Sequence, residues 1–183
     1  MVRSISVKTC CFAAAAVVLG VVFFASCWTP AYADSAQTTK LLQQAKMSAI
    51  QLRNDSSQMK TYVGSGLSWR SHAKQIDIIK EQVNKSGKIL AELHDARDSS
   101  APWQQEVIDK ITPLLQEMAS NTESIINHLN DRQHTWQPKY QAYLTSNSEL
   151  SADLSKLIGD YIDFGKAKSR TDKMSQSLGF SGS

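Results

Sequence analysis

Histidines and aromatic residues are the side chains of this sequence whose positions most resemble a binding site. Trp69 and His72 stand three residues apart in LSWRSHAK, and His128 and Tyr140 follow further along the chain. Imidazoles that converge from several helices can hold zinc or copper, and aromatic side chains beside them can cover a small ligand. The candidate ligand or metal site is therefore Trp69, His72, His128 and Tyr140.

A structural role accounts for the same residues and is the interpretation that the sequence favours. No Glu-x-x-His pair, the pattern of di-metal helical bundles, accompanies these histidines. Aromatic residues are large enough to close the end of a bundle. A partly buried imidazole commonly hydrogen-bonds a tyrosine or a backbone carbonyl, and we expect this for His72.

Catalysis and haem binding find little support in the sequence. It contains no glycine-rich phosphate loop, nucleophile elbow or His-Glu zinc motif. A c-type haem needs Cys-x-x-Cys-His, and a b-type site in a four-helix bundle would need a histidine in the last predicted helix, residues 138–178, which has none. We expect neither an enzyme nor a cofactor.

The first 33 residues have the features of a secretory signal peptide. Arg3 and Lys8 precede an uninterrupted apolar run over 10–27, and small residues occupy positions Ala31 and Ala33. This pattern predicts export, with cleavage between Ala33 and Asp34 and a mature chain in the periplasm or outside the cell.

Two alternatives to cleavage remain open for this leader. Its apolar run is near the lower length limit for a membrane span, so an uncleaved N-terminal anchor is one. The stretch FASC (24–27) loosely resembles a bacterial lipobox, which would leave a lipid anchor on Cys27. All three interpretations predict export, and we expect no membrane span once the leader is removed.

Cysteine content and charge narrow the function further. Cys10, Cys11 and Cys27 all lie in the leader, so the mature chain is cysteine-free, with no disulfide scaffold or thiolate metal site. The leader also carries two of the 20 basic residues and no acidic one, so its removal lowers the formal net charge from +3 to +1. A nearly neutral chain gives no reason to expect nucleic acid as a partner.

The mature chain shows the apolar periodicity of long amphipathic helices. Apolar residues recur at alternating steps of three and four, and turn-forming residues interrupt the pattern. Short links between long helices force neighbours to run antiparallel. The predicted fold is therefore all-α, an up-down-up-down four-helix bundle. The predicted elements are a signal peptide over 1–33, a bundle over 34–178 with helices at about 35–64, 67–98, 102–131 and 138–178, and a disordered tail at 179–183.

Two helices depart from the simple pattern. Pro113 lies inside the third helix and should kink it without ending it. The fourth helix is the longest; beyond its apolar part it carries Lys166, Arg170 and Lys173, and we expect a fraying extension there. Its predicted core positions are Tyr140, Tyr143, Asn147, Leu150, Leu154, Leu157, Tyr161 and Phe164.

The up-down topology also assigns residues to the two ends of the bundle. One end collects Tyr62, Trp69, His72, His128, His134, Trp136, Tyr140 and Tyr143. At the other end we expect Trp103, which follows Pro102, to act as an apolar plug.

Residues 67–130 resemble a group of uncharacterised exported helical-bundle proteins of acidobacterial type. The similarity is carried by WxxHA from Trp69, ARxxxxPWQ from Ala96 and LN from Leu129, in this order. The resemblance implies a bacterial exported bundle and brings no known activity with it.

These observations favour a non-enzymatic exported protein of the cell envelope, with an interaction or structural role. Its partner would be another envelope protein or a second copy of the chain. The alternative is a bundle that binds a metal or a small ligand at the Trp69/His72/His128 end.

Overall fold

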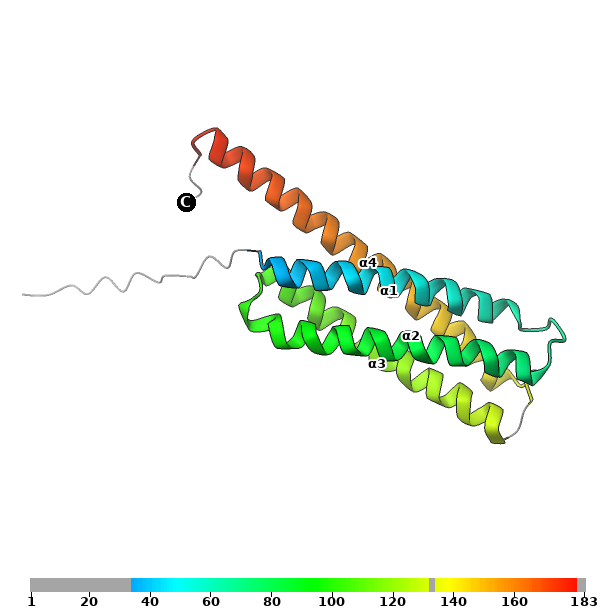
Figure 1. The fold of residues 1–183 in the computed structure, drawn as a ribbon. Coiled ribbons are helices and arrows are strands. Elements are labelled where there is room, and N and C mark those ends of the chain that lie inside the picture. Colours follow the sequence, from blue (N-terminus) through cyan, green and yellow to red (C-terminus); the bar gives the residue numbers. More distant parts are fainter. Residues whose placement is uncertain (1–33, 132–133, 181–183) are drawn as a thin grey trace, which may run out of the picture. The chain divides into compact units, whose positions relative to one another are not determined.

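The computed structural model describes residues 34–131 and 134–180, and four α-helices account for most of them (Figure 1). The helices are α1 (Ala36–Thr61), α2 (Trp69–Ala96), α3 (Pro102–Asp131) and α4 (Pro138–Ser177), with a short 3-10 turn, η1 (Arg97–Ser99), after α2. The predicted all-α four-helix bundle is confirmed.

Each helix packs against two neighbours, in the pairs α1–α2, α2–α3, α3–α4 and α1–α4. Successive helices run in opposite directions (Figure 1). The start of α1, the α2–α3 connection and the second half of α4 therefore lie at one end, called here the Trp103 end, and the last turns of α4 extend away from the other helices (Figure 1). The histidines predicted to cluster lie at the opposite end, called the histidine end.

Local sequence signals begin and end these helices. The side-chain oxygens of Ser35 and Ser68 accept hydrogen bonds from the backbone N–H three residues later, at 3.2 and 3.4 Å. Such caps satisfy donors that a first helical turn leaves unpaired. Between α1 and α2, Gly64 and Gly66 have φ of +73° and +72°, a conformation that glycine adopts without strain.

Prolines mark the starts of the other two helices. Pro102 is the first residue of α3 and Pro138 the first of α4, where the missing N–H costs no helical hydrogen bond. Pro113 lies inside α3, and the helix continues past it to Asp131, as the sequence predicts.

The core follows the predicted apolar pattern in the first three helices. From α1 it takes Leu42, Leu52 and Met59, and from α2 it takes Ile76 and Ile79, all at most 2% exposed. From α3 the core takes Val107, Ile108, Ile111, Leu115, Met118, Ile125 and Leu129. This core lies wholly within residues 34–180.

The predicted core positions of α4 are partly wrong. Leu150, Leu157 and Tyr161 are only half-buried, and Phe164 is 54% exposed. The face of α4 that packs against the bundle is rotated from the predicted one. The prediction missed this face because several of its residues are small, and small residues do not stand out in a pattern of apolar side chains. Its buried members are Tyr140, Leu144, Asn147, Ser151, Leu154, Ser155, Ile158, Ile162 and Gly165.

The last turns of α4, after Gly165, extend beyond the buried part of the helix. Of the described helices α4 is the longest, with 40 residues against 30 in α3, and it is helical to Ser177, close to the predicted end at 178 (Figure 1). Lys168 and Asp172 form an i,i+4 ion pair of 2.8 Å on this segment, an arrangement that supports an exposed helix. We call residues 166–180 the α4 extension.

A buried glutamine ties the start of α1 to the start of α3. Gln104 is fully buried, and its side-chain amide makes four hydrogen bonds of 3.0–3.1 Å. The oxygen accepts from the N–H groups of Ser35 and Ala101, and the nitrogen donates to Ser35 O and Thr39 Oγ1. Because every hydrogen-bonding site of the amide is used, its burial carries no penalty for a lost partner.

Trp103 packs directly on the backbone of α4. A Cβ atom placed on Gly165 would lie 2.5 Å from Cζ2 of the indole, closer than atoms can approach. The indole therefore occupies the space that a side chain at position 165 would need. This contact confirms Trp103 as a plug of its end and shows that the plug requires a glycine.

The predicted leader, with Cys10, Cys11 and Cys27, lies outside the described residues, as do positions 181–183 of the predicted tail. Among residues 34–131 and 134–180, no helix combines the length and apolar character needed to cross a bilayer.

Gly165→Ala should destabilise the bundle by about 1–3 kcal/mol, because the new methyl group overlaps the indole of Trp103. The matched control is Gly87→Ala in α2, where a Cβ meets no atom within 4 Å. That change should raise stability by about 0.5–1 kcal/mol through helix propensity. Urea denaturation measures both, and equal effects of the two substitutions would contradict the packing argument.

Candidate functional site

His72 and Tyr140 form a buried hydrogen bond between α2 and α4 at the histidine end. His72 Nδ1 and the Tyr140 hydroxyl are 2.8 Å apart, and the two residues are 1% and 0% exposed. The ring of Tyr62 meets the imidazole edge-on, with 5.4 Å between centroids. The predicted hydrogen bond of His72 to a tyrosine is confirmed.

His128 packs on the other side of Tyr140. The two ring centroids are 5.0 Å apart, and His128 Nε2 lies 2.8 Å from the backbone oxygen of His134. A carbonyl only accepts hydrogen bonds, so this nitrogen carries the proton and donates it. His128 thus holds the backbone that leads into α4.

Trp69, the fourth candidate residue, lies apart from this stack. It is half-buried at the start of α2, and the guanidinium of Arg70 lies 4.8 Å from its ring. Within the described part of the chain, the ring contacts of His72, His128 and Tyr140 do not include Trp69. The structure therefore brings three of the four predicted residues together.

The chemistry available to this cluster is limited. Burial lowers the pKa of His72 and raises the pKa of the Tyr140 hydroxyl, so both groups are neutral near pH 7. Among the residues that the structure describes, no group of three or more His, Cys, Asp or Glu side chains is placed to hold a metal ion. The observed contacts hold helices together.

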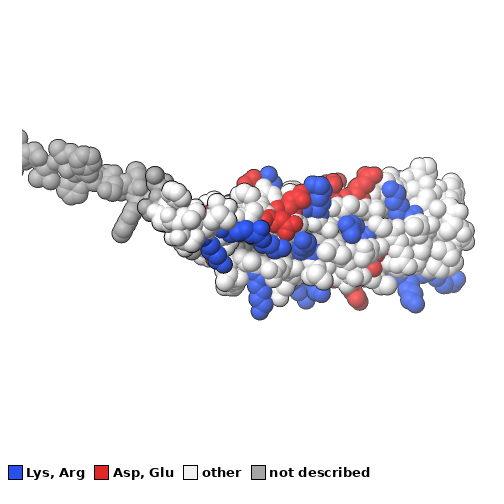
Figure 2. Space-filling view, turned by 90° about the horizontal axis from the view of Figure 1, so that it is seen from above, with Lys and Arg blue, Asp and Glu red and all other residues white. Residues whose placement is uncertain are grey.

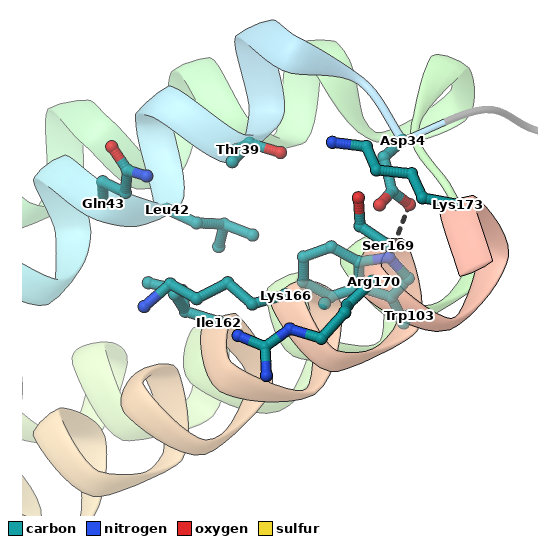
Figure 3. A pocket seen from close by; sticks show the side chains of 11 residues that line it. Asp34, Thr39, Leu42, Gln43, Trp103, Ile162, Lys166, Ser169, Arg170 and Lys173 are labelled. Carbon is teal, nitrogen blue, oxygen red and sulfur yellow. Dashed lines mark hydrogen bonds between the residues drawn. The ribbon is translucent and has the colours of Figure 1, made fainter. Parts of the chain in front are cut away.

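A groove at the Trp103 end was not predicted from the sequence. This Trp103 groove lies between the start of α1 and the second half of α4, and its volume is about 510 Å³ (Figure 3). Leu42, Trp103 and Ile162 supply its apolar surface. The volume is in the range of small-molecule sites, and most of the residues that line the groove are polar or charged.

Charged side chains surround this apolar surface. Lys166, Arg170 and Lys173 line the groove from α4, and Asp34 lines it from the start of the described chain. The Asp34 carboxylate accepts a hydrogen bond of 2.7 Å from Trp103 Nε1, drawn as a dashed line in Figure 3. Lys173 extends toward Thr39 in the same view. Cations therefore outnumber anions in the groove.

This local excess differs from the rest of the visible surface. In Figure 2, basic and acidic side chains alternate along the bundle without a broad field of one sign. The basic lining of the groove is a property of one face of α4.

The sequence contained a signal for this groove. Lys166, Arg170 and Lys173 follow one another at steps of four and three, so they share a helix face. They come directly after Gly165, whose contact with Trp103 brings α4 against the start of α3. A shared face of cations does not by itself indicate a groove, because an exposed helix end can carry the same pattern.

Comparison of the chain with protein-family models, with curated proteins and with solved structures gives no match. The resemblance to exported bundles of acidobacterial type therefore stays a prediction.

Tyr140→Phe should destabilise the protein by about 1–3 kcal/mol, because it removes the hydrogen-bond partner of a buried imidazole nitrogen. Tyr143→Phe is the matched control, since that half-buried hydroxyl makes no hydrogen bond within the described residues. Chemical denaturation of both variants measures the difference. Similar stabilities would show that the bond to His72 contributes little.

The lowered pKa of His72 makes stability depend on pH in a defined direction. The unfolded imidazole titrates near 6.5 and the folded one below it, so the unfolded state takes up a proton first as the pH falls. The contribution of His72 is full above pH 6.5 and is lost as the pH falls from there toward the folded pKa. Unfolding free energies at pH 7.5 and 5 should differ less in His72→Asn than in the original chain. An unchanged difference would assign the pH dependence to other groups.

Proposed function

We propose that this protein is a non-enzymatic, exported helical-bundle protein of the cell envelope that works by interaction. The proposed interacting part is the α4 extension together with Phe164, which lies just before it in the helix. Its partner is another envelope protein or a second copy of the chain.

Exposed apolar side chains on this part of α4 are the observation that carries the proposal. Phe164, Met174 and Leu178 are 54%, 56% and 63% exposed. Large apolar residues gathered on one segment of a water-facing helix are typical of a surface that another molecule covers. Met174 and Leu178 lie beyond the buried residues of α4, while the ring of Phe164 also packs edge-on against Trp103, with 6.4 Å between centroids.

The use of buried polar groups supports a non-enzymatic role. Ser48 and Ser86 bond each other across α1 and α2 at 2.8 Å, and Asn147 donates to Thr122 across α4 and α3 at 3.1 Å. Like the His72–Tyr140 pair, these groups hydrogen-bond to neighbouring helices, while the buried Oδ1 of Asn147 has no partner among the described residues. Polar pairs of this kind fix the register of packed helices.

Export rests on the leader sequence, and the location of the mature protein in the periplasm or outside the cell is part of the proposal. The alternative function, a metal or ligand at Trp69, His72 and His128, has less support. One nitrogen of each histidine is already in a hydrogen bond, and Trp69 stands apart.

A photoreactive residue at Met174 should crosslink to a discrete partner in bacteria that export the chain. Met47 on α1 is the matched control, because it is an exposed methionine, 68% accessible, on another part of the bundle. A product of twice the chain mass indicates self-association, and a larger or smaller one indicates an envelope protein.

Two results would contradict the proposed function. Crosslinking of equal yield at Met174 and Met47, or none at Met174, would remove the α4 extension as the interacting part. Recovery of the protein in the cytosolic fraction would remove export.

A further inference from the structure

We propose that the Trp103 groove binds a single-chain anionic amphiphile, with a carboxylate head at the cations of α4 and a hydrocarbon tail on the apolar surface. This inference rests on the proposed function, because both assume that the protein acts by binding another molecule. It adds a separate site and a ligand class.

The cations of the groove are available to an anion. Lys166 has a partner, the Asp163 carboxylate at 3.0 Å. Within the described residues, no carboxylate lies within 4.0 Å of the charged nitrogens of Arg170 or Lys173. A guanidinium can hold a carboxylate through two parallel hydrogen bonds, and a neighbouring ammonium adds charge.

The one acidic side chain of the groove is already engaged. Asp34 Oδ1 accepts the indole N–H of Trp103 at 2.7 Å, which holds the carboxylate beside the ring. In Figure 3 the guanidinium of Arg170 extends from α4 on the side of the groove away from Asp34. An anionic head group near Arg170 would therefore avoid the carboxylate of Asp34.

The apolar lining explains why the ligand needs a tail. Leu42, Ile162 and Trp103 are at most 8% exposed, yet each contributes to the wall of the groove. A small inorganic anion would make no contact with these side chains, and an uncharged hydrocarbon would make none with the cations. A volume of about 510 Å³ accommodates a hydrocarbon chain of moderate length.

A membrane surface is the competing occupant, and the groove favours a single molecule. The exposed apolar residues Phe164, Met174 and Leu178 are not part of its lining, while Lys166 and Arg170 are. The cations therefore lie next to the apolar residues inside the groove. A bilayer, being flat, would meet the outer residues instead.

Calorimetric titration of dodecanoate, below its micelle concentration, into the chain that begins at Asp34 tests the proposal. This chain contains the whole core described above, and circular dichroism checks its helix content. We expect saturable binding of one dodecanoate. Acetate, which has the head alone, and a nonionic dodecyl glycoside, which has the tail alone, should each bind at least about tenfold more weakly.

Variants locate the site. Arg170→Gln with Lys173→Gln should weaken dodecanoate binding by about tenfold or more, because the groove loses the guanidinium that binds the head group and a second positive charge. The control is Lys74→Gln with Lys80→Gln on α2, which makes the same change in net charge at exposed positions. This control should retain the original affinity. Equal affinity in the two double variants would overturn the proposal.

A local readout shows whether the tail reaches the indole. In a chain with Trp69→Phe and Trp136→Phe, Trp103 is the remaining tryptophan after residue 34, and a terminally brominated dodecanoate should quench its fluorescence. Binding without quenching would place the ligand elsewhere. Stronger binding to anionic phosphatidylglycerol vesicles than to dodecanoate, unaffected by the Arg170 and Lys173 changes, would favour the membrane and overturn the groove.

The two proposals fail separately. Met174 does not line the groove, so its crosslinking reports on the interaction role alone. Absence of dodecanoate binding with a discrete crosslink at Met174 would remove the ligand and leave the proposed function in place.

Discussion

The contact between Trp103 and Gly165 is the constraint on which the Trp103 end of the bundle depends. An indole is among the largest side chains, and here it occupies the space that a side chain at position 165 of α4 would need. The contact fixes how closely α3 and α4 approach, and it sets the position from which the α4 extension leaves the core. Together with the direct packing of α1 against α4, it places Lys166 and Arg170 beside the start of α1.

The two ends of the bundle solve the problem of buried polar groups in different ways. At the Trp103 end, the amide of Gln104 uses all its hydrogen-bonding sites on backbone and side-chain partners of α1 and α3. At the histidine end, an imidazole and a phenol satisfy each other while both stay neutral. Both arrangements join helices, and the Trp103 end also has a groove in which the charged nitrogens of Arg170 and Lys173 lie more than 4.0 Å from any described carboxylate.

The periodicity of apolar residues was sufficient to predict the helices and the antiparallel arrangement, because burying a stripe on each helix leaves few other folds. It did not predict the buried face of α4 correctly. That face includes Ser151, Ser155 and Gly165, whose small side chains do not stand out in an apolar pattern. The hydrogen bond of His72 was foreseeable from its position on a buried stripe. The groove was not, because it depends on the close approach of Trp103 and Gly165, which are far apart in sequence and carry no periodic signal.

Asp34 is both the first residue that the structure describes and part of the wall of the groove. The predicted cleavage after Ala33 would turn its backbone amide into a free α-ammonium group. Maturation would then add a positive charge at the rim of the groove, beside a carboxylate held by Trp103. The precursor and the mature protein would then differ in their electrostatic preference for anions, because the new charge lies beside the groove.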